Sequence, residues 1–456
     1  MLRSILTLTA VFITIHLQAQ TWDVYDIDFG AKPAIAIDSL DQVHIAYMLE
    51  ETDGGFIRHA LWKDGRFDTT LIDQAYYYGP LDIAISPEGH PHIAVHHHED
   101  ENEYIYRWDG LLWEALPVVS EGHDGWDNSL TFDQAGNIHT SSIDPAQFGS
   151  GEGVEYGFFD GTEWTKESIS AGPASYEYST CIQVDSEGHP HIVFYDDFGD
   201  NLVYAHKKSG KWLNFTIANK GGLFASMVLD ENDEPHITYY EQLAGDVGLV
   251  RYVRLVADEW TSEVIDELEN VPLGFTGARN MTALAIDRFG QLIVCYGDRK
   301  VVKYATLLAD GWTTEFIADH TQNDTLLGAQ VDLVLDSERR PHITFFTLES
   351  EFPVSGTIRY ATRDVLASQQ DVLATPRFWK VFPNPVEDQL QIEWNTKHKQ
   401  PREVQMRLID LDGKVILGKM LTTNQMNLSL ANLTAGVYHL QIKVNGAWQT
   451  QKIVKL

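Results

Sequence analysis

Three consecutive histidines, His96, His97 and His98, are the side chains of this sequence best suited to acid–base chemistry. Histidine titrates near neutral pH, so it can serve as a general base, with a tyrosine as the acid. In an extended strand His96 and His98 point to one side and His97 to the other, so at most two can act together. With the upstream pair Tyr77 and Tyr78, the sequence predicts His97, His98, Tyr77 and Tyr78 as candidate catalytic residues.

A larger set of aromatic, acidic and cationic side chains is suited to binding a sugar. One face of a sugar ring is apolar and stacks on an aromatic ring, while its hydroxyl groups bind charged acceptors. The predicted ligand-binding residues are Tyr76, His96, His123, Trp126, Asp127, Tyr178, Asp196, Arg279 and Arg299. A merely solvated acidic surface is the alternative interpretation of the same segments.

The sequence predicts no metal site and no cofactor. Calcium is left open as an alternative at the acidic stretch Asp196, Asp197 and Asp200, because carboxylate oxygens are usual calcium ligands. This stretch lacks the twelve-residue loop pattern of the common calcium-binding motif.

The charge of the chain excludes one class of partner. Its 456 residues, 44% of them hydrophobic, include 33 Lys and Arg against 66 Asp and Glu, for a net charge of −33. Such a field repels phosphate backbones, so we exclude nucleic acid. Residues 376–456 hold 11 Lys or Arg and 6 Asp or Glu, whereas residues 1–375 hold 22 and 60. This change of sign predicts a separate C-terminal domain.

The chain between its two ends repeats itself. Each repeat has an apolar strand, a tight turn, two further strands, and a fourth strand that begins with an aromatic residue. The turn position holds Asp38, Ser86, Asp133, Asp185, Asp230, Asp287 and Asp336. Six residues later come His44, His92, His139, His191, His236, Ile293 and His342. Because both rows recur once per repeat, we interpret them as structural: the Asp caps the turn and the His bonds nearby.

Four short strands per repeat are typical of a β-propeller blade, so the sequence predicts an all-β fold with a seven-bladed β-propeller over residues 20–365. Six repeats have a fourth-strand aromatic, and Trp22 near the N-terminus supplies the seventh. We therefore expect the N-terminal strand to complete the last blade and close the ring, which removes an exposed sheet edge. Functional residues are then expected in the loops after second strands and between blades.

The N-terminus has the pattern of a secretory signal peptide. A short positive start is followed by an apolar run from Ser4 to Leu17 and by the small residue Ala19. The run is too short to span a bilayer. We expect residues 1–19 to be a cleaved signal peptide.

The C-terminal residues predict a small immunoglobulin-like β-sandwich over 376–456, after a linker at 366–375. Alternating strands are expected at 390–394, 404–408 and 437–442. The segments Val381–Pro385, Leu433–Tyr438 and Lys452–Leu456 resemble, in this order, the motifs of the type A sorting domain of the bacterial type IX secretion system. The resemblance implies that residues 376–456 engage the type IX secretion machinery.

The stretch Ala84–His98 resembles one blade of the propeller polysaccharide lyases, a family that uses His and Tyr side chains. It departs from the family upstream, where another His is expected and this chain has Tyr77 and Tyr78. Such lyases act on uronic acids and need cationic side chains, for which Arg279, Arg299 and Lys300 are available. The acidic charge of the propeller region would steer an anionic substrate poorly.

These observations predict a monomeric protein, secreted or held at the outer cell surface, that binds a glycan or a protein. A glycan-active enzyme, either a lyase or a hydrolase with its site at the channel mouth, is the alternative. A purely structural surface protein is a third class. The sequence leaves open whether the chain is an enzyme.

Overall fold

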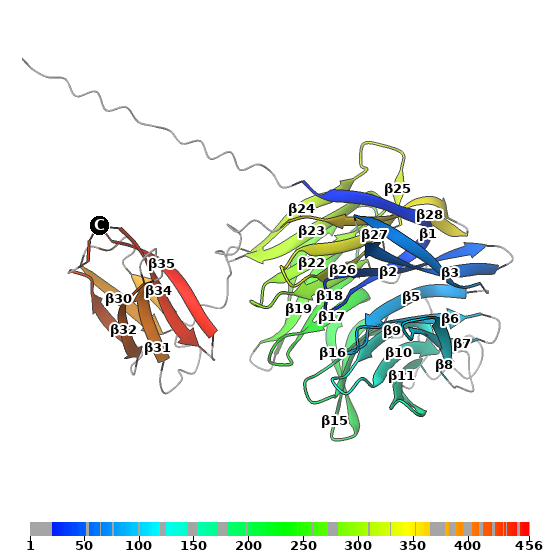
Figure 1. Cartoon of the computed structure of the whole chain (residues 1–456), viewed down its shortest axis with the longest axis horizontal. Coiled ribbons are helices and arrows are strands. Elements are labelled where there is room, and N and C mark those ends of the chain that lie inside the picture. The colour runs from blue at the N-terminus through cyan, green and yellow to red at the C-terminus, as the bar shows by residue number, and fades with distance from the viewer. Residues whose placement is uncertain are drawn as a thin grey trace, which may run out of the picture. The chain divides into compact units, whose positions relative to one another are not determined.

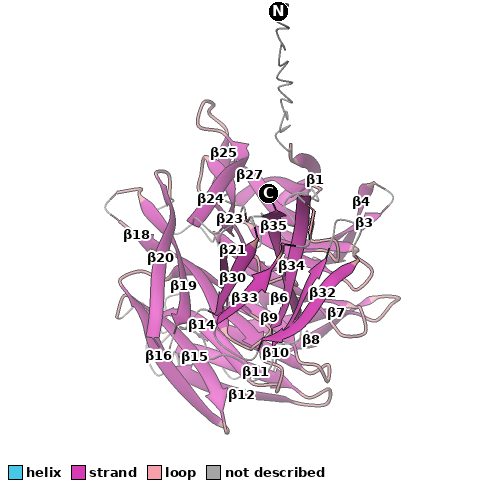
Figure 2. Cartoon of the chain, turned by 90° about the vertical axis from the view of Figure 1, so that its left-hand side faces the viewer, coloured by secondary structure: helices cyan, strands magenta, loops and turns pink. Residues whose placement is uncertain are grey.

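The computed structural model describes residues 21–364 and 379–455, except 52–53, 64, 75–76, 99–100, 119–124, 145–152, 171–179, 197–198, 244, 257–258, 272–280, 309–310, 329, 352, 383–385, 387, 395–403, 410–413, 422–424, 432, 435 and 445–446. The described residues form strands, turns and loops, which confirms the all-β prediction, and include no helix that could cross a membrane (Figure 2). The chain divides into two compact units, and the main part of the second follows the first after Gln370. The predicted signal peptide and linker lie outside the described residues.

The first unit is built from antiparallel sets of four strands that follow one another along the chain (Figure 1). Five of these sets are separate sheets: β5 (Tyr77–Ile85), β6 (Pro91–His97), β7 (Asn102–Trp108) and β8 (Trp113–Pro117); β9 (Trp126–Phe132), β10 (Ile138–Asp144), β11 (Gly153–Phe159) and β12 (Trp164–Ser170); β13 (Thr180–Val184), β14 (Pro190–Asp196), β15 (Asn201–Lys208) and β16 (Lys211–Asn219); β17 (Leu223–Leu229), β18 (Pro235–Gln242), β19 (Gly248–Val256) and β20 (Glu259–Leu268); β21 (Thr282–Ile286), β22 (Leu292–Gly297), β23 (Val301–Leu308) and β24 (Gly311–Asp319). The predicted repeat is therefore also a repeat of the structure.

The remaining strands of this unit form one larger sheet. Its members are β25 (Leu326–Leu327), β26 (Asp332–Leu335), β27 (Pro341–Glu351), β28 (Val354–Thr362), β1 (Asp23–Ile37), β2 (Val43–Glu51), β3 (Gly54–Lys63) and β4 (Arg66–Asp73). The larger sheet thus contains the last repeat of the chain and the first.

β1 belongs to both of these repeats. Its residues up to Gly30 pair with β28, and its residues from Ala31 pair with β2. The register shifts just after Ala31, where Lys32 has a φ of 53°. A β-bulge of this kind bends a strand, so that the two halves can follow different partners. The N-terminal strand therefore supplies the fourth strand of the last repeat, which is the pairing expected from the sequence.

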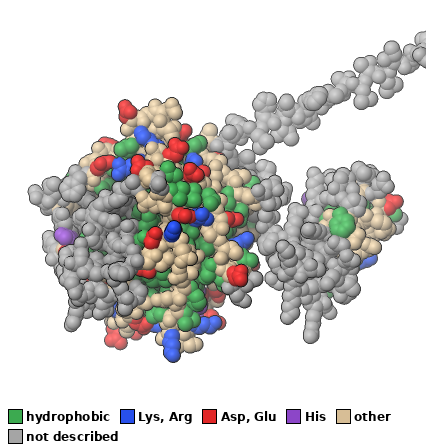
Figure 3. Space-filling model, turned by 180° about the vertical axis from the view of Figure 1, so that it is seen from behind, with side chains coloured by type: hydrophobic (Ala, Val, Ile, Leu, Met, Phe, Trp, Pro, Cys, Tyr) green, Lys and Arg blue, Asp and Glu red, His purple; other side chains and the backbone are tan. Residues whose placement is uncertain are grey.

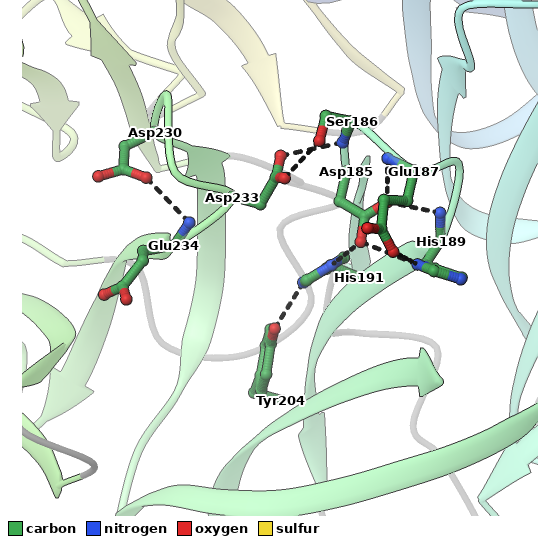
Figure 4. Close-up of polar contacts among 9 residues, drawn as sticks. All are labelled: Asp185, Ser186, Glu187, His189, His191, Tyr204, Asp230, Asp233 and Glu234. Carbon is green, nitrogen blue, oxygen red and sulfur yellow. Dashed lines mark hydrogen bonds and ion pairs between the residues drawn. The ribbon is translucent and has the colours of Figure 1, made fainter. Parts of the chain in front are cut away.

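The Asp and His rows form a relay at the turn between the first and second strands of a repeat. In the sheet β13–β16 the carboxylate of Asp185 accepts hydrogen bonds from the backbone N–H groups of Glu187 (2.9 Å) and His189 (2.7 Å) (Figure 4). His191 lies with Nε2 3.5 Å from Asp185 and with Nδ1 2.5 Å from the hydroxyl oxygen of Tyr204. The turn is thereby tied to the second and third strands.

The same relay recurs in most repeats. The His–Asp distances are 3.6 Å for His44 and Asp38, 3.5 Å for His139 and Asp133, 3.8 Å for His236 and Asp230, and 3.3 Å for His342 and Asp336. The third-strand partners are His59 (2.9 Å from His44), Tyr156 (2.8 Å from His139), Tyr252 (2.5 Å from His236) and Tyr360 (2.5 Å from His342). These contacts support the interpretation that both rows are structural.

Side chains also join neighbouring turns. The carboxylate of Asp233 accepts hydrogen bonds from the N–H and the hydroxyl of Ser186, at 2.9 and 2.6 Å (Figure 4). Asp41 accepts the same two bonds from Ser337, at 2.9 and 2.5 Å. The second contact joins the first repeat to the last one.

Six of the seven fourth-strand aromatics pack against the third strand of the preceding repeat. Their ring centroids lie 5.2–5.5 Å apart in edge-on pairs: Phe67 with Tyr360, Trp113 with His59, Trp212 with Tyr156, Trp260 with Tyr204, Trp312 with Tyr252, and Trp22 with Tyr304. Trp22 therefore occupies in the last repeat the place that Trp260 has in the fifth.

The second unit contains two antiparallel sheets. Their strands are β29 (Trp379–Phe382), β30 (Gln389–Trp394) and β33 (Gln425–Ser429), and β32 (Val415–Leu421), β31 (Val404–Ile409), β34 (Gly436–Val444) and β35 (Ala447–Lys455). One core of buried side chains draws on both sheets, with Leu390 and Ile392 from β30 and Leu440 and Ile442 from β34. This arrangement is a β-sandwich, and it contains all three strands predicted for this segment.

The buried histidines of the first unit make its stability depend on pH. Burial lowers the pKa of His44, His191 and His342 below the ordinary value near 6.5, and lowers that of His92 to about 4. As the pH falls, these histidines therefore bind protons at a higher pH in the unfolded chain than in the folded chain. Above about pH 6.5 these groups should not change the free energy of unfolding. As the pH falls below about 6.5, the free energy of unfolding should decrease. We expect calorimetry to show a melting temperature that falls between pH 6.5 and pH 4.

The variant His92→Gln is the control for this pH dependence. It removes one group whose pKa is lowered to about 4, so its melting temperature should depend less on pH than that of the parent. A parent melting temperature that does not change across this range would contradict the assignment of neutral, buried histidines.

Trp22→Ala tests whether the N-terminal strand packs in solution as it does in this structure. The substitution removes a ring that lies 5.2 Å from Tyr304, so the free energy of unfolding should decrease by about 2–3 kcal/mol in urea titrations. Trp260→Ala removes the corresponding ring, 5.2 Å from Tyr204, and should have a similar effect. A normal loss for Trp260→Ala with no loss for Trp22→Ala would show that β1 does not complete the last repeat.

Candidate functional site

The described candidate residues lie at the ends of the sheets opposite to the Asp turns. They follow a second strand or begin a first strand, whereas each Asp turn joins the first strand to the second. They are His96 and His97 at the end of β6, His98 directly after it, Trp126 and Asp127 at the start of β9, Asp196 at the end of β14, and Arg299 after β22.

The other predicted residues lie wholly or partly outside the described part of the chain. Tyr76, His123, Tyr178 and Arg279 lie outside the described residues. For Tyr77 and Tyr78 the backbone shows that their Cα atoms pair with those of His97 and His96 across β5 and β6. The register therefore places the two candidate catalytic segments next to each other.

His96, His98 and Glu101 form a compact polar group around the loop that joins β6 to β7. Nε2 of His96 lies 3.4 Å from one carboxylate oxygen of Glu101, and Nδ1 of His98 lies 3.3 Å from the other. The side chain of His96 is fully buried, whereas that of His98 is 41% exposed. Burial lowers the pKa of His96, against the opposing effect of Glu101. The group extends from the interior to the surface.

Trp126 joins this group to the next sheet. Its ring centroid lies 4.5 Å from that of His96, with the planes inclined by 33°. Trp126 is 6% exposed and Asp127 is 4% exposed, and Asp127 has a φ of 47°. The ring of Trp126 therefore packs against His96 rather than presenting an open face to a sugar. Its role as a ligand-binding residue stays a prediction.

Buried and half-buried charges lie near the polar group. Glu103 pairs with His96 across β6 and β7, and it is fully buried. From the next sheet, Nζ of Lys166 lies 2.6 Å from a carboxylate oxygen of Glu155. Burial lowers the pKa of Lys166 to about 8, and the charge of Glu103 opposes this shift. Ionic side chains of two neighbouring sheets thus interact in the interior, where such interactions are strong.

Asp196 and Arg299 lie in other sheets than this group. Arg299 is paired with Glu351 at 2.5 Å. In the stretch left open for calcium, the carboxylate of Asp200 accepts hydrogen bonds from the Tyr195 hydroxyl (2.9 Å) and the Gly221 N–H (3.0 Å). The structure thus brings His96, His98 and Trp126 together and leaves Asp196 and Arg299 apart from them.

The sequence analysis missed Glu101, Glu103 and Lys166. Glu101 had a usable signal, because it lies three residues after His98 and in the same loop. Glu103 and Lys166 had no local signal, because their interaction depends on how two sheets pack.

Comparison with known families explains the second unit. Residues 380–456 match the family described as "Secretion system C-terminal sorting domain". The C-terminal segment is a secretion sorting domain. The resemblance to the type IX sorting domain is thereby confirmed, and with it export to the outside or the outer surface of the cell. The sorting domain implies an interaction with the secretion machinery.

Solved structures provide a second comparison. Similar chains include an α-L-arabinanase from Penicillium chrysogenum (TM-score 0.47, 11% identity, 77% of this chain and 100% of that one) and the polysaccharide lyase Uly1 (TM-score 0.44, 9% identity, 74% and 90%). A protein of unknown function from Dyadobacter fermentans has a TM-score of 0.43 and 10% identity, over 75% and 99% of the two chains. No curated protein matches this chain. At this similarity, the substrates of these proteins say nothing about a substrate of this chain.

Gly125→Ala tests the packing beneath the candidate site. Gly125 has a φ of 85°, and a Cβ atom there would lie 2.6–2.8 Å from Cβ, Cα and N of Glu103. We expect the free energy of unfolding to fall by more than about 2 kcal/mol in a urea titration. Gly110→Ala is the matched control, since Gly110 has a φ of 97° with open space around it. Equal losses for both variants would contradict a tight contact between Gly125 and Glu103.

Proposed function

We propose that residues 20–365 form a closed seven-bladed β-propeller, followed by a linker at 366–375 and an immunoglobulin-like domain at 376–456. Contacts between first strands support the ring: β26 lies beside both β21 and β1. The carboxylate of Asp332 in β26 accepts a hydrogen bond of 2.9 Å from the N–H of Ile35 in β1. The Asp41–Ser337 bonds and the pairing of β1 with β28 support the same closure.

We further propose that the propeller is a binding module for an extracellular glycan or protein. One observation carries this proposal. The end of β6 and the loop after it contribute His96, His98 and Glu101, and the next blade contributes Trp126. These side chains meet at one place outside the repeated relay. A side chain that recurs in every repeat is explained by the fold, whereas one that is present in a single repeat is a candidate for a specific function. Partly exposed imidazole and carboxylate groups can form hydrogen bonds with the hydroxyl groups of a ligand, as donors or as acceptors.

The charge of the chain favours an uncharged ligand. On the face shown in Figure 3, Lys and Arg side chains are scattered singly among acidic and uncharged ones. A polyanionic ligand would need clustered cations, because the net charge of −33 repels it. A neutral polysaccharide is therefore the ligand class that we propose, and nucleic acid is not one.

A glycan-active enzyme is the second candidate function. The observation in its favour is the register of β5 and β6, which pairs Tyr77 with His97. A tyrosine and a histidine side by side can supply the acid and the base of a lyase or hydrolase. In this second candidate function, His97 and either Tyr77 or Tyr78 are the catalytic residues, and His98 lies at the edge of the same site.

The remaining parts of the proposal concern maturation. We propose that residues 1–19 are removed as a signal peptide and that the mature protein is a monomer outside the cell. The sorting domain, which directs export, supports the need for such a signal.

The binding proposal is tested with the full chain lacking residues 1–19 and a panel of neutral and acidic polysaccharides. Binding is measured by calorimetry, and released oligosaccharides are measured by mass spectrometry. We expect binding to a neutral polysaccharide without products, and a loss of affinity of about tenfold in His98→Ala, equivalent to about 1.4 kcal/mol.

His189→Ala is the control for this experiment. His189 is also a partly exposed histidine beside carboxylates, but it lies at an Asp turn, on the opposite ends of the sheets. Its substitution should leave binding unchanged. Released products that disappear in His97→Ala would replace the binding module with the enzyme. Equal effects of His98→Ala and His189→Ala would contradict this location of the site.

A further inference from the structure

The histidines at the end of β6 differ from the repeated ones in their surroundings. Five of the repeated histidines lie between an Asp of the turn and a third-strand side chain, as His191 lies between Asp185 and Tyr204. His96 and His98 instead face one carboxylate, that of Glu101. Two imidazoles and one carboxylate around a short loop need an explanation other than the repeat.

The distances within this group match those between ligands of one metal ion. Nitrogen and oxygen ligands lie about 2.0–2.1 Å from zinc, so two ligands of a tetrahedral site are about 3.3 Å apart. The two His–Glu distances are 3.4 and 3.3 Å, each to a different oxygen of the carboxylate, so both oxygens can face one ion. One ligand atom from each of the three residues lies within 4.8 Å of the other two. Among the described residues this is the one group of three or more such side chains with this geometry.

We infer that His96, His98 and Glu101 bind one divalent cation of the zinc type, through Nε2 of His96, Nδ1 of His98 and the Glu101 carboxylate. Zinc accepts mixed nitrogen and oxygen ligands, and three protein ligands leave a fourth position for water or a ligand oxygen. Calcium and magnesium prefer oxygen ligands throughout, so this site should discriminate against both.

The flexibility and anchoring of the three ligands suit this role. His96 is fully buried against Trp126, so its position is fixed by packing. His98 is 41% exposed, so a rotation of its side chain can bring its nitrogen closer to that of His96. Glu101 has a φ of 54°, a conformation that glycine and asparagine adopt more readily. Replacing Glu101 by Gly therefore removes the carboxylate without straining the loop.

A bound cation would fasten the loop between β6 and β7 at the place where the first unit departs from its repeat. Through His96 it would also hold the ring of Trp126 from the next sheet. The inference does not rest on the proposed binding function. If the protein binds zinc but no glycan, the inference holds and the proposed binding function fails. If the protein binds a glycan but no zinc, only the inference fails.

The test uses the full chain without residues 1–19, treated with EDTA and then dialysed. Calorimetry with ZnCl2 at pH 7.5 should show one ion bound per chain, and an excess of Ca²⁺ should not displace it. Co²⁺ should give the visible absorption bands of a tetrahedral site. His98→Ala, Glu101→Gln and Glu101→Gly should each weaken Zn²⁺ binding by about 100-fold or more.

Two controls make the result decisive. His189→Ala removes a histidine beside Asp185, whose carboxylate also faces His191. Among the described residues these side chains do not bring three ligand atoms within 4.8 Å of one another, so Zn²⁺ affinity should be unchanged. Glu101→Gly should melt in the absence of metal at or above the temperature of the EDTA-treated parent, which separates loss of a ligand from loss of folding. No Zn²⁺ binding by the parent, or equal affinity in the parent and all Glu101 and His98 variants, would overturn the inference.

Discussion

The pairing of β1 with two different strands is the constraint on which the first unit depends. A strand that pairs on one side with β28 and continues into β2 ties the last repeat of the chain to the first. Two side-chain contacts join the same repeats, one from Asp332 to Ile35 and one from Ser337 to Asp41. Long-range pairing of this kind carries an entropic cost, and it also covers the edge of β28.

The repeated relay shows how one residue type can have two roles in the same chain. His191 is buried between a turn Asp and a third-strand Tyr, and His342 has the same surroundings in the last repeat. His98 instead lies beside Glu101, in the loop between β6 and β7, and is partly exposed. Recurrence at a fixed position therefore indicates packing, whereas departure from the repeat indicates where chemistry specific to this protein can occur.

The candidate site was predictable only in part. The three histidines, Tyr77 and Tyr78 were found from residue type, and the register of β5 with β6 follows from their places in one repeat. The burial of Trp126 was not predictable, because an aromatic side chain at the start of a strand is covered or exposed according to which residues of the neighbouring sheet pack on it. Here that cover is His96.

By itself the sequence determined the repeat, the all-β class, the strand that completes the last repeat, and the sorting domain. All of these follow from local patterns, in which alternation and turn residues recur along the chain. Only the tertiary structure decided that Glu101 faces two histidines and that Lys166 interacts with Glu103 from another sheet. The physical reason is that such groups depend on loop geometry and on packing between sheets, and neither leaves a periodic trace in the sequence.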